Sequence, residues 1–130
     1  EGDAAPTGLA IDIKNNILFS TCAGIKKLAI IDISSGKMIT NLPISNKVDA
    51  VAYDAITQFI FCSGGDGITT IIKQISREKY EVVDSLITKA GAKTLAINTK
   101  THKLYLSTAD YLVGSKDVNP NSFSLLVFSR

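Results

Sequence analysis

The sequence predicts an all-β protein built from β-propeller blades, and two features that recur along the chain support that prediction. A short apolar segment ending in Asp or Asn occurs three times, at steps of 42 and 44 residues, in residues 9–12, 51–54 and 95–98. Each unit of roughly 40 residues holds short runs of β-branched and aromatic residues divided by turn residues, which is typical of a four-stranded blade. An aromatic residue recurs at the same steps, as Phe19, Phe61 and Tyr105.

The first unit, residues 1–47, is expected to form a complete blade. Residues 14–16 read Lys-Asn-Asn, and Asn tolerates the left-handed backbone that a tight hairpin needs. Residues 23–24 and 34–36 supply two further turns, and Pro43 ends the unit. The four expected strands span residues 8–13, 17–22, 28–33 and 37–42.

The second unit, residues 48–91, repeats this plan with a clearer turn. Residues 64–67 contain Asp-Gly between two strand-like runs, which is a strong hairpin signal. The expected strands span residues 49–54, 58–63, 68–75 and 80–87.

The third unit, residues 92–130, is expected to form an incomplete blade within the same domain. Its strands are predicted at residues 94–98, 103–107 and 123–129, with a long polar loop at 108–122 and no fourth strand. A propeller ring has four to eight blades. Three units therefore require further blades or self-association to close a ring.

Composition limits the functional classes. The chain is 45% hydrophobic and 20% charged, as expected of a folded domain, and its apolar runs are far shorter than the roughly 20 residues of a membrane-spanning helix. The net charge is +2 and the lysines are scattered, so charge alone does not indicate nucleic-acid or membrane binding. No metal-ligand spacing, phosphate loop or serine elbow is present, so no cofactor, metal site or catalytic residue is predicted.

The unit patterns resemble those of the YVTN-repeat, YncE-like family of β-propellers. The resemblance implies a bacterial seven-bladed propeller, exported to the periplasm or secreted, of which these units would be the last three blades. Most members of that family have no assigned activity, so no catalytic residue is transferred. The segments that carry the resemblance are residues 6–12, 16–20, 30–37, 48–54, 65–67, 101–109 and 122–128.

The candidate binding residues lie on loops at one end of the expected channel. In each blade, the loop before the first strand and the loop between the second and third strands lie at the same end of the channel. Binding residues concentrate on such loops, because a rigid scaffold leaves their sequences free to vary. Asp49 and Lys93 hold matching positions beside the channel, although solvated loop charges are the simpler reading. Asp66 is a further candidate, but one carboxylate without a following helix fits a turn residue better than a calcium or phosphate site.

The loop at 108–122 is the strongest binding candidate, because it is the one long insertion in a regular array. Long loops in compact domains are either functional or merely mobile. Its candidate binding residues are Asp110, Tyr111, Lys116 and Asp117.

Three polar features of the repeat are expected to be structural. Asp12, Asp54 and Asn98 should each close the turn after a first strand by bonding the backbone, as Asx residues do. Cys22 and Cys62 should be buried small side chains that form no disulfide with each other, because equivalent faces of neighbouring blades do not face each other.

The only histidine, His102, falls in a hairpin at the end opposite the candidate loops. We expect it to lack both an orienting carboxylate and a cleft, which a general base needs.

The sequence thus favours a non-catalytic binding module whose partner is a protein or a cell-surface component. Two alternatives stay open. Nucleic acid could bind through loop lysines, with a steep dependence on salt, or an enzyme could use essential residues from blades outside this sequence. The lysines concerned are Lys26, Lys27, Lys47, Lys89, Lys93 and Lys116.

Overall fold

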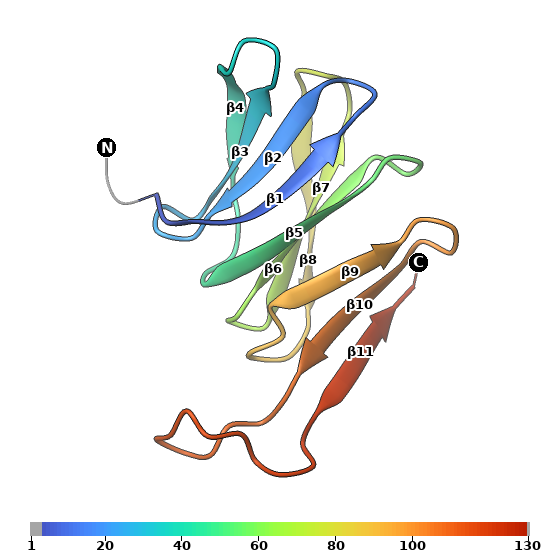
Figure 1. Cartoon of the computed structure of the whole chain (residues 1–130). Helices are drawn as coiled ribbons and strands as arrows, with labels where there is room; N and C mark the ends of the chain where they lie inside the picture. Colours follow the sequence, from blue (N-terminus) through green and yellow to red (C-terminus); the bar gives the residue numbers. More distant parts are fainter. Residues whose placement is uncertain (1–3, 130) are drawn as a thin grey trace.

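A computed structural model describes residues 4–129, in which the regular structure consists of β-strands and the turns between them. Eleven strands form three antiparallel sheets of four, four and three strands, arranged side by side (Figure 1). We call the sheets blade 1 (β1–β4), blade 2 (β5–β8) and blade 3 (β9–β11). The strands are β1 (Pro6–Asp12), β2 (Ile17–Cys22), β3 (Lys27–Asp32), β4 (Met38–Pro43), β5 (Val48–Asp54), β6 (Phe59–Gly64), β7 (Ile68–Gln74), β8 (Tyr80–Ile87), β9 (Thr94–Asn98), β10 (Lys103–Thr108) and β11 (Ser124–Phe128).

The predicted fold class is confirmed, and the strand ends differ from expectation by only one or two residues. The third strand, β3, ends at Asp32 because the carboxylate of that residue accepts the backbone N–H of Ser34 at 3.0 Å and turns the chain. In blade 3 the described strands stop at β11, so the sheet has three strands, as the sequence predicted.

The first hairpin of every blade turns through one residue with a left-handed backbone. These residues are Asn16, Gln58 and His102, with φ angles of 58°, 59° and 58°. Asn is common in this conformation, whereas Gln and His adopt it less readily. The conformation recurs at the same place in all three repeats, so the hairpin geometry is set by the strands that it joins.

Two apolar cores hold the blades together. Between blades 1 and 2, Phe19 is fully buried, and its ring centroid lies 5.1 Å from that of Tyr53 and 6.1 Å from that of Tyr80. Between blades 2 and 3, Phe61 and Ile71 pack with Leu104 and Leu106. The first core also contains Ile17, Leu28, Ile30, Leu42, Ile44, Val48, Ile60, Cys62 and Ile72.

The cysteines are free thiols and both are buried, as the sequence predicted. Cys62 is fully buried within the core between blades 1 and 2, and burial raises the pKa of its thiol. Cys22 is 8% exposed.

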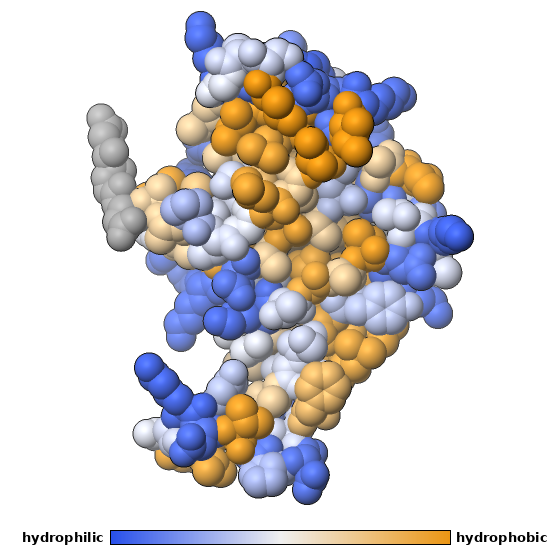
Figure 2. Space-filling model, in the orientation of Figure 1, coloured by the Kyte–Doolittle hydropathy of each residue, from blue (hydrophilic) through white to orange (hydrophobic). Residues whose placement is uncertain are grey.

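The two faces at the ends of the three-blade stack expose apolar side chains. On blade 1, Leu9 is 66% exposed and Met38 is 58% exposed, while on blade 3 Leu125 is 57% exposed. Apolar surface is visible over blade 1 in the upper part of Figure 2. Residues 4–129 hold no helix of the length and apolarity that a membrane crossing requires.

Candidate functional site

The first two candidate residues, Asp49 and Lys93, lie close together. The Lys93 ammonium is 4.0 Å from the Asp49 carboxylate, and both side chains are about half exposed. Blade 2 also holds the backbone of Lys93, because the Ser63 hydroxyl donates a hydrogen bond to its carbonyl oxygen. An exposed pair at this distance contributes little to stability. Because both side chains are about half exposed, the two charges are accessible to solvent and to a partner.

The long loop is fastened to the segment between blades 2 and 3. The Lys89 ammonium lies 2.6 Å from the Asp110 carboxylate, and the Thr108 hydroxyl donates to the carbonyl oxygen of Ala90 at 3.3 Å. Both contacts join the base of the loop to residues that precede β9. The base therefore has a fixed place on the blade.

Beyond its base, the loop forms a small hairpin rather than a wholly irregular segment. Tyr111 and Val118 make an antiparallel bridge, and the N–H of Leu112 donates to the carbonyl oxygen of Asp117 at 2.9 Å. The N–H of Asn119 donates to the carbonyl oxygen of Asp110 at 2.7 Å. These bonds order a loop that sequence reasoning could describe only as long and polar.

This hairpin, residues 109–123, exposes apolar side chains as well as charges. The space-filling view shows both kinds of surface on the loop at the lower left (Figure 2). Of the candidate residues, Tyr111 is 56% exposed, and Lys116 and Asp117 are exposed near the hairpin tip. The exposed apolar side chains of the loop are Tyr111 (56%), Leu112 (46%), Val113 (104%), Val118 (48%) and Phe123 (73%).

Asp66 is placed as a turn residue. One carboxylate oxygen accepts the N–H of Asn46 at 2.9 Å and the other accepts the N–H of Ile68 at 3.2 Å. The carboxylate is thus occupied by backbone groups. Within residues 4–129, no group of three His, Cys, Asp or Glu side chains is arranged to hold a metal ion.

Two of the six lysines considered for nucleic-acid binding form ion pairs with acidic residues. Lys89 and Lys93 pair with Asp110 and Asp49, so a phosphate would have to compete with those carboxylates.

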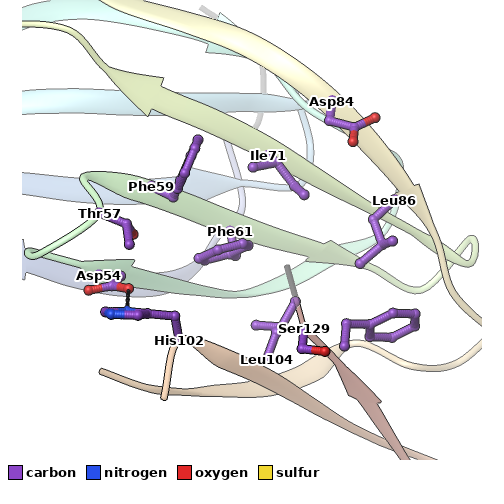
Figure 3. Close-up of a pocket in the computed structure, with 11 residues that line it drawn as sticks. Asp54, Thr57, Phe59, Phe61, Ile71, Asp84, Leu86, His102, Leu104 and Ser129 are labelled. Atoms are coloured by element: carbon purple, nitrogen blue, oxygen red, sulfur yellow. Dashed lines mark hydrogen bonds and ion pairs between the residues drawn. The ribbon is translucent and has the colours of Figure 1, made fainter. Parts of the chain in front are cut away.

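The opposite end of the blades holds a site that the sequence reasoning missed. His102 Nδ1 lies 2.6 Å from a carboxylate oxygen of Asp54, whose side chain is 1% exposed (Figure 3). Both residues line a cavity of about 230 Å³ between blades 2 and 3. The expectation that His102 lacks an orienting carboxylate and a cleft was therefore wrong. The two residues are 48 positions apart, so only the packing of one blade on the next reveals the pair.

Burial and hydrogen bonding act against each other on Asp54. Burial disfavours the charged carboxylate, but hydrogen bonds led by that of His102 outweigh it, and the pKa of Asp54 lies below its ordinary value. Because an ionised carboxylate only accepts hydrogen bonds, the shared proton belongs to His102 Nδ1. The pair links β5 of blade 2 to the β9–β10 hairpin of blade 3.

An analogous polar link joins blades 1 and 2. The Asp12 carboxylate is 2% exposed, and one of its oxygens accepts from Gln74 Nε2 at 3.0 Å and from the Tyr53 hydroxyl at 3.3 Å. Hydrogen bonds from Asn15, Gln74 and Tyr53 outweigh the effect of burial and hold the pKa of Asp12 below its ordinary value.

The expected Asx turns are confirmed at all three positions. Asp12 accepts the N–H of Asn15, Asp54 accepts that of Ile56, and Asn98 accepts that of Lys100. The sequence did not reveal that the first two carboxylates also reach into the next blade.

Comparisons with known proteins support the class of fold defined by these sheets. No protein-family profile matches the chain, and no curated protein matches its sequence. Several solved structures match its shape, and they include β-propellers. The chain is therefore part of a β-propeller fold, made of two four-stranded blades and one three-stranded blade in the part described.

Three of these structures show how far the likeness extends. Hydrazine synthase of Kuenenia stuttgartiensis matches 82% of this chain with a TM-score of 0.71 and 11% identity, and a chain of the mitotic checkpoint complex matches 78% with 0.69 and 12%. The β-propeller domain of Cps50 (Swd1) from Myceliophteria thermophila matches 78% with a TM-score of 0.64 and 10% identity. The matched region spans 30%, 32% and 36% of those chains, respectively. At such identities the likeness concerns the fold alone.

Proposed function

We propose that this chain is part of a non-catalytic propeller that binds another protein through its loop end. The observation that carries the proposal is the hairpin at residues 109–123, which has a fixed base and an exposed apolar surface. Val113 is fully exposed at 104%, and Phe123 is 73% exposed. Apolar side chains gathered on one projecting element are typical of protein interaction sites.

The fixed base strengthens this reading. The Lys89–Asp110 ion pair and the Thr108 hydrogen bond hold the base of the hairpin against the segment between blades 2 and 3, and its own backbone bonds fix its shape. A partner then loses less conformational entropy on binding than it would with a disordered loop. The charges of Asp49 and Lys93 lie at the same end of the blades and would form part of a polar rim.

The wider setting of the proposal comes from the resemblance of the repeats. We place the chain in a YVTN-repeat, YncE-like propeller of seven blades, bacterial in origin and located in the periplasm or outside the cell. Its ring would be completed by blades outside residues 1–130 or by self-association. In this setting, the partner is a protein or another component of the cell surface.

The test compares two substitutions that introduce the same charge at opposite ends of the blades. Val113→Asp changes the hairpin, and Ile56→Asp is the matched control, because Ile56 is 71% exposed in the β5–β6 turn. Both substitutions lie on the surface and should change stability by no more than about 0.5 kcal/mol. Each variant and the natural chain would be immobilised and exposed to a bacterial cell-envelope extract.

Proteins held by the natural chain and by Ile56→Asp, but lost from Val113→Asp, would support the proposal. Proteins held equally by all three chains, or no protein held by any of them, would count against it.

A further inference from the structure

We propose that a polar cavity between blades 1 and 2 binds one neutral sugar ring, or a polyol of similar size. The cavity has a volume of about 190 Å³ and lies at the end of the blades opposite the hairpin at residues 109–123. The two sites share no residue, so the inference is independent of the proposed function.

The cavity is built by the two four-stranded blades alone. Its inner wall carries the buried side chains of Asp12 and Gln74, which are 2% and 1% exposed. Gln74 Nε2 donates to the Asp12 carboxylate at 3.0 Å, and the Tyr53 hydroxyl lies 2.5 Å from Gln74 Oε1, so these polar groups have fixed positions. The outer walls come from the β1–β2, β5–β6 and β7–β8 turns, which contribute Lys14 and Asn15, Ala55 and Gln58, and Ser76 and Arg77.

The charges around the cavity favour a neutral ligand. Arg77 Nη2 lies 3.0 Å from the Asp32 carboxylate, so the charge of Arg77 is balanced by a group outside the lining. The other charged groups of the lining are the Asp12 carboxylate and the Lys14 ammonium, one of each sign. A cation would be repelled by Lys14 and an anion by Asp12, so neither would recover the cost of leaving water.

The hydrogen-bonding groups of the lining match hydroxyl groups. Gln58 offers both a carbonyl oxygen and an NH₂ group, and its side-chain amide has no partner within residues 4–129. The Ser76 hydroxyl accepts the N–H groups of Glu78 and Lys79, which leaves its own proton to donate. Lys14 supplies donors only. A sugar hydroxyl both donates and accepts, so neighbouring hydroxyls on one ring can satisfy this mixture.

Size and lining argue against other neutral ligands. The cavity has room for about six water molecules, less than a drug-sized ligand needs. A peptide would require an apolar wall, whereas Ala55 and Tyr53 are the only apolar or aromatic residues of the lining. A free amino acid would place its ammonium, with three N–H donors, on Asp12. That carboxylate already accepts hydrogen bonds from Asn15, Gln74 and Tyr53.

Nuclear magnetic resonance titration of the full 130-residue chain tests the site. Glucose, galactose and mannose would be added separately, and glycine, ammonium chloride and sodium sulfate would probe the disfavoured classes. A hexose has about 12 non-hydrogen atoms, and at ordinary ligand efficiency its Kd should be about 1–10 mM. We expect at least one sugar to shift the side-chain amide signals of Asn15, Gln58 and Gln74 along one saturable curve.

Two outcomes of this titration would overturn the proposal. One is the absence of a saturable shift with all three sugars. The other is a response of the same signals to glycine or to either salt at lower concentrations than to the sugars.

Two tryptophan substitutions in one turn separate the cavity from the surface beside it. Ala55 lines the cavity, and its repeat equivalent, Ile13, shows that this turn position accepts a large side chain. Ala55→Trp should fill the cavity and abolish the sugar-induced shifts of Asn15 and Gln74. Ile56→Trp is the matched control, because Ile56 is 71% exposed and lies outside the lining, and it should leave Kd unchanged.

A third variant tests the polar contacts without filling the space. Gln58→Leu keeps the length of the side chain but removes its amide, and it should raise Kd about three- to tenfold. Sugar binding that survives in Ala55→Trp, that is lost equally in Ile56→Trp, or that is unaffected by Gln58→Leu would refute the site.

Discussion

The difference between the two interfaces predicts unequal effects of one substitution made at equivalent positions. Phe19→Leu and Phe61→Leu both keep an apolar side chain, so the loss of ring contacts dominates the change. Phe19 makes ring contacts with Tyr53 and Tyr80, whereas Phe61 makes one with Phe59 at a centroid distance of 6.4 Å. Aromatic pairs contribute about 0.5–1.5 kcal/mol each beyond the area that they bury.

The expected losses follow from these contacts. Phe19→Leu should lower the free energy of unfolding by about 1–3 kcal/mol, and Phe61→Leu by about 0.5–1.5 kcal/mol. With a urea m-value of about 2 kcal/mol/M, a difference of about 1 kcal/mol separates the two midpoints by about 0.5 M. Urea unfolding followed by far-ultraviolet circular dichroism would measure both midpoints.

The third repeat supplies the control. Tyr105 is the equivalent residue of blade 3, and Tyr105→Leu should shift stability by no more than about 0.5 kcal/mol, because its face is turned away from blade 2. A loss in Phe61→Leu equal to or greater than that in Phe19→Leu, at unchanged m-value, would refute the claim that the additional ring contact of Phe19 makes the larger contribution to stability.

Three further predictions concern titration, thiol reactivity and the hairpin. The lowered pKa of Asp12 adds stability above the carboxyl's unfolded pKa of about 4, and this contribution is lost as the pH falls through the lower folded value. Acid titration of Asp12→Asn should therefore show lower stability at pH 7 and a shallower decline below about pH 4 than the natural chain. Cys62 is fully buried with a raised thiol pKa, so an aromatic disulfide reagent should modify Cys22 first and Cys62 only as the chain unfolds; equal rates in native buffer would contradict its burial. Lys89→Met should cost at most about 1 kcal/mol of global stability, because its ion pair with Asp110 is half exposed, yet it should speed hydrogen exchange in residues 109–123; unchanged exchange would show that the pair does not hold the loop.

The repeat in the sequence predicted most of the fold, because strands and turns are determined by neighbouring residues. The residue pattern located every described strand within one or two positions, and the Asx turns at Asp12, Asp54 and Asn98 followed from local chemistry. Asp49 and Lys93 hold the same position in successive units, and the structure brings their charges within 4.0 Å of each other, a contact that the sequence did not indicate.

The contacts between blades could not be predicted in the same way. Asp12 and Gln74 are 62 positions apart, and Asp54 and His102 are 48 positions apart. Their meeting depends on the angle and spacing at which one sheet packs on the next, and no local pattern encodes these. The order within the long hairpin was missed for a different reason. Tyr111 and Val118 are residue types that favour strands, but a single isolated bridge is too short to give the alternating pattern that predicts a strand.

The repeated carboxylates explain how the blades keep their alignment. Apolar rows on facing sheets allow small sliding movements, because hydrophobic contact is not directional. A buried carboxylate is unfavourable unless its hydrogen bonds are made. A shift between blades would break the hydrogen bonds that Asp12 and Asp54 accept from the next blade and leave only those from their own turns. Asn98, at the third equivalent position, is exposed and carries no charge. A charged carboxylate thus occurs at the two positions where a described neighbouring blade supplies its partners, which is where it can fix the stacking of one blade on the next.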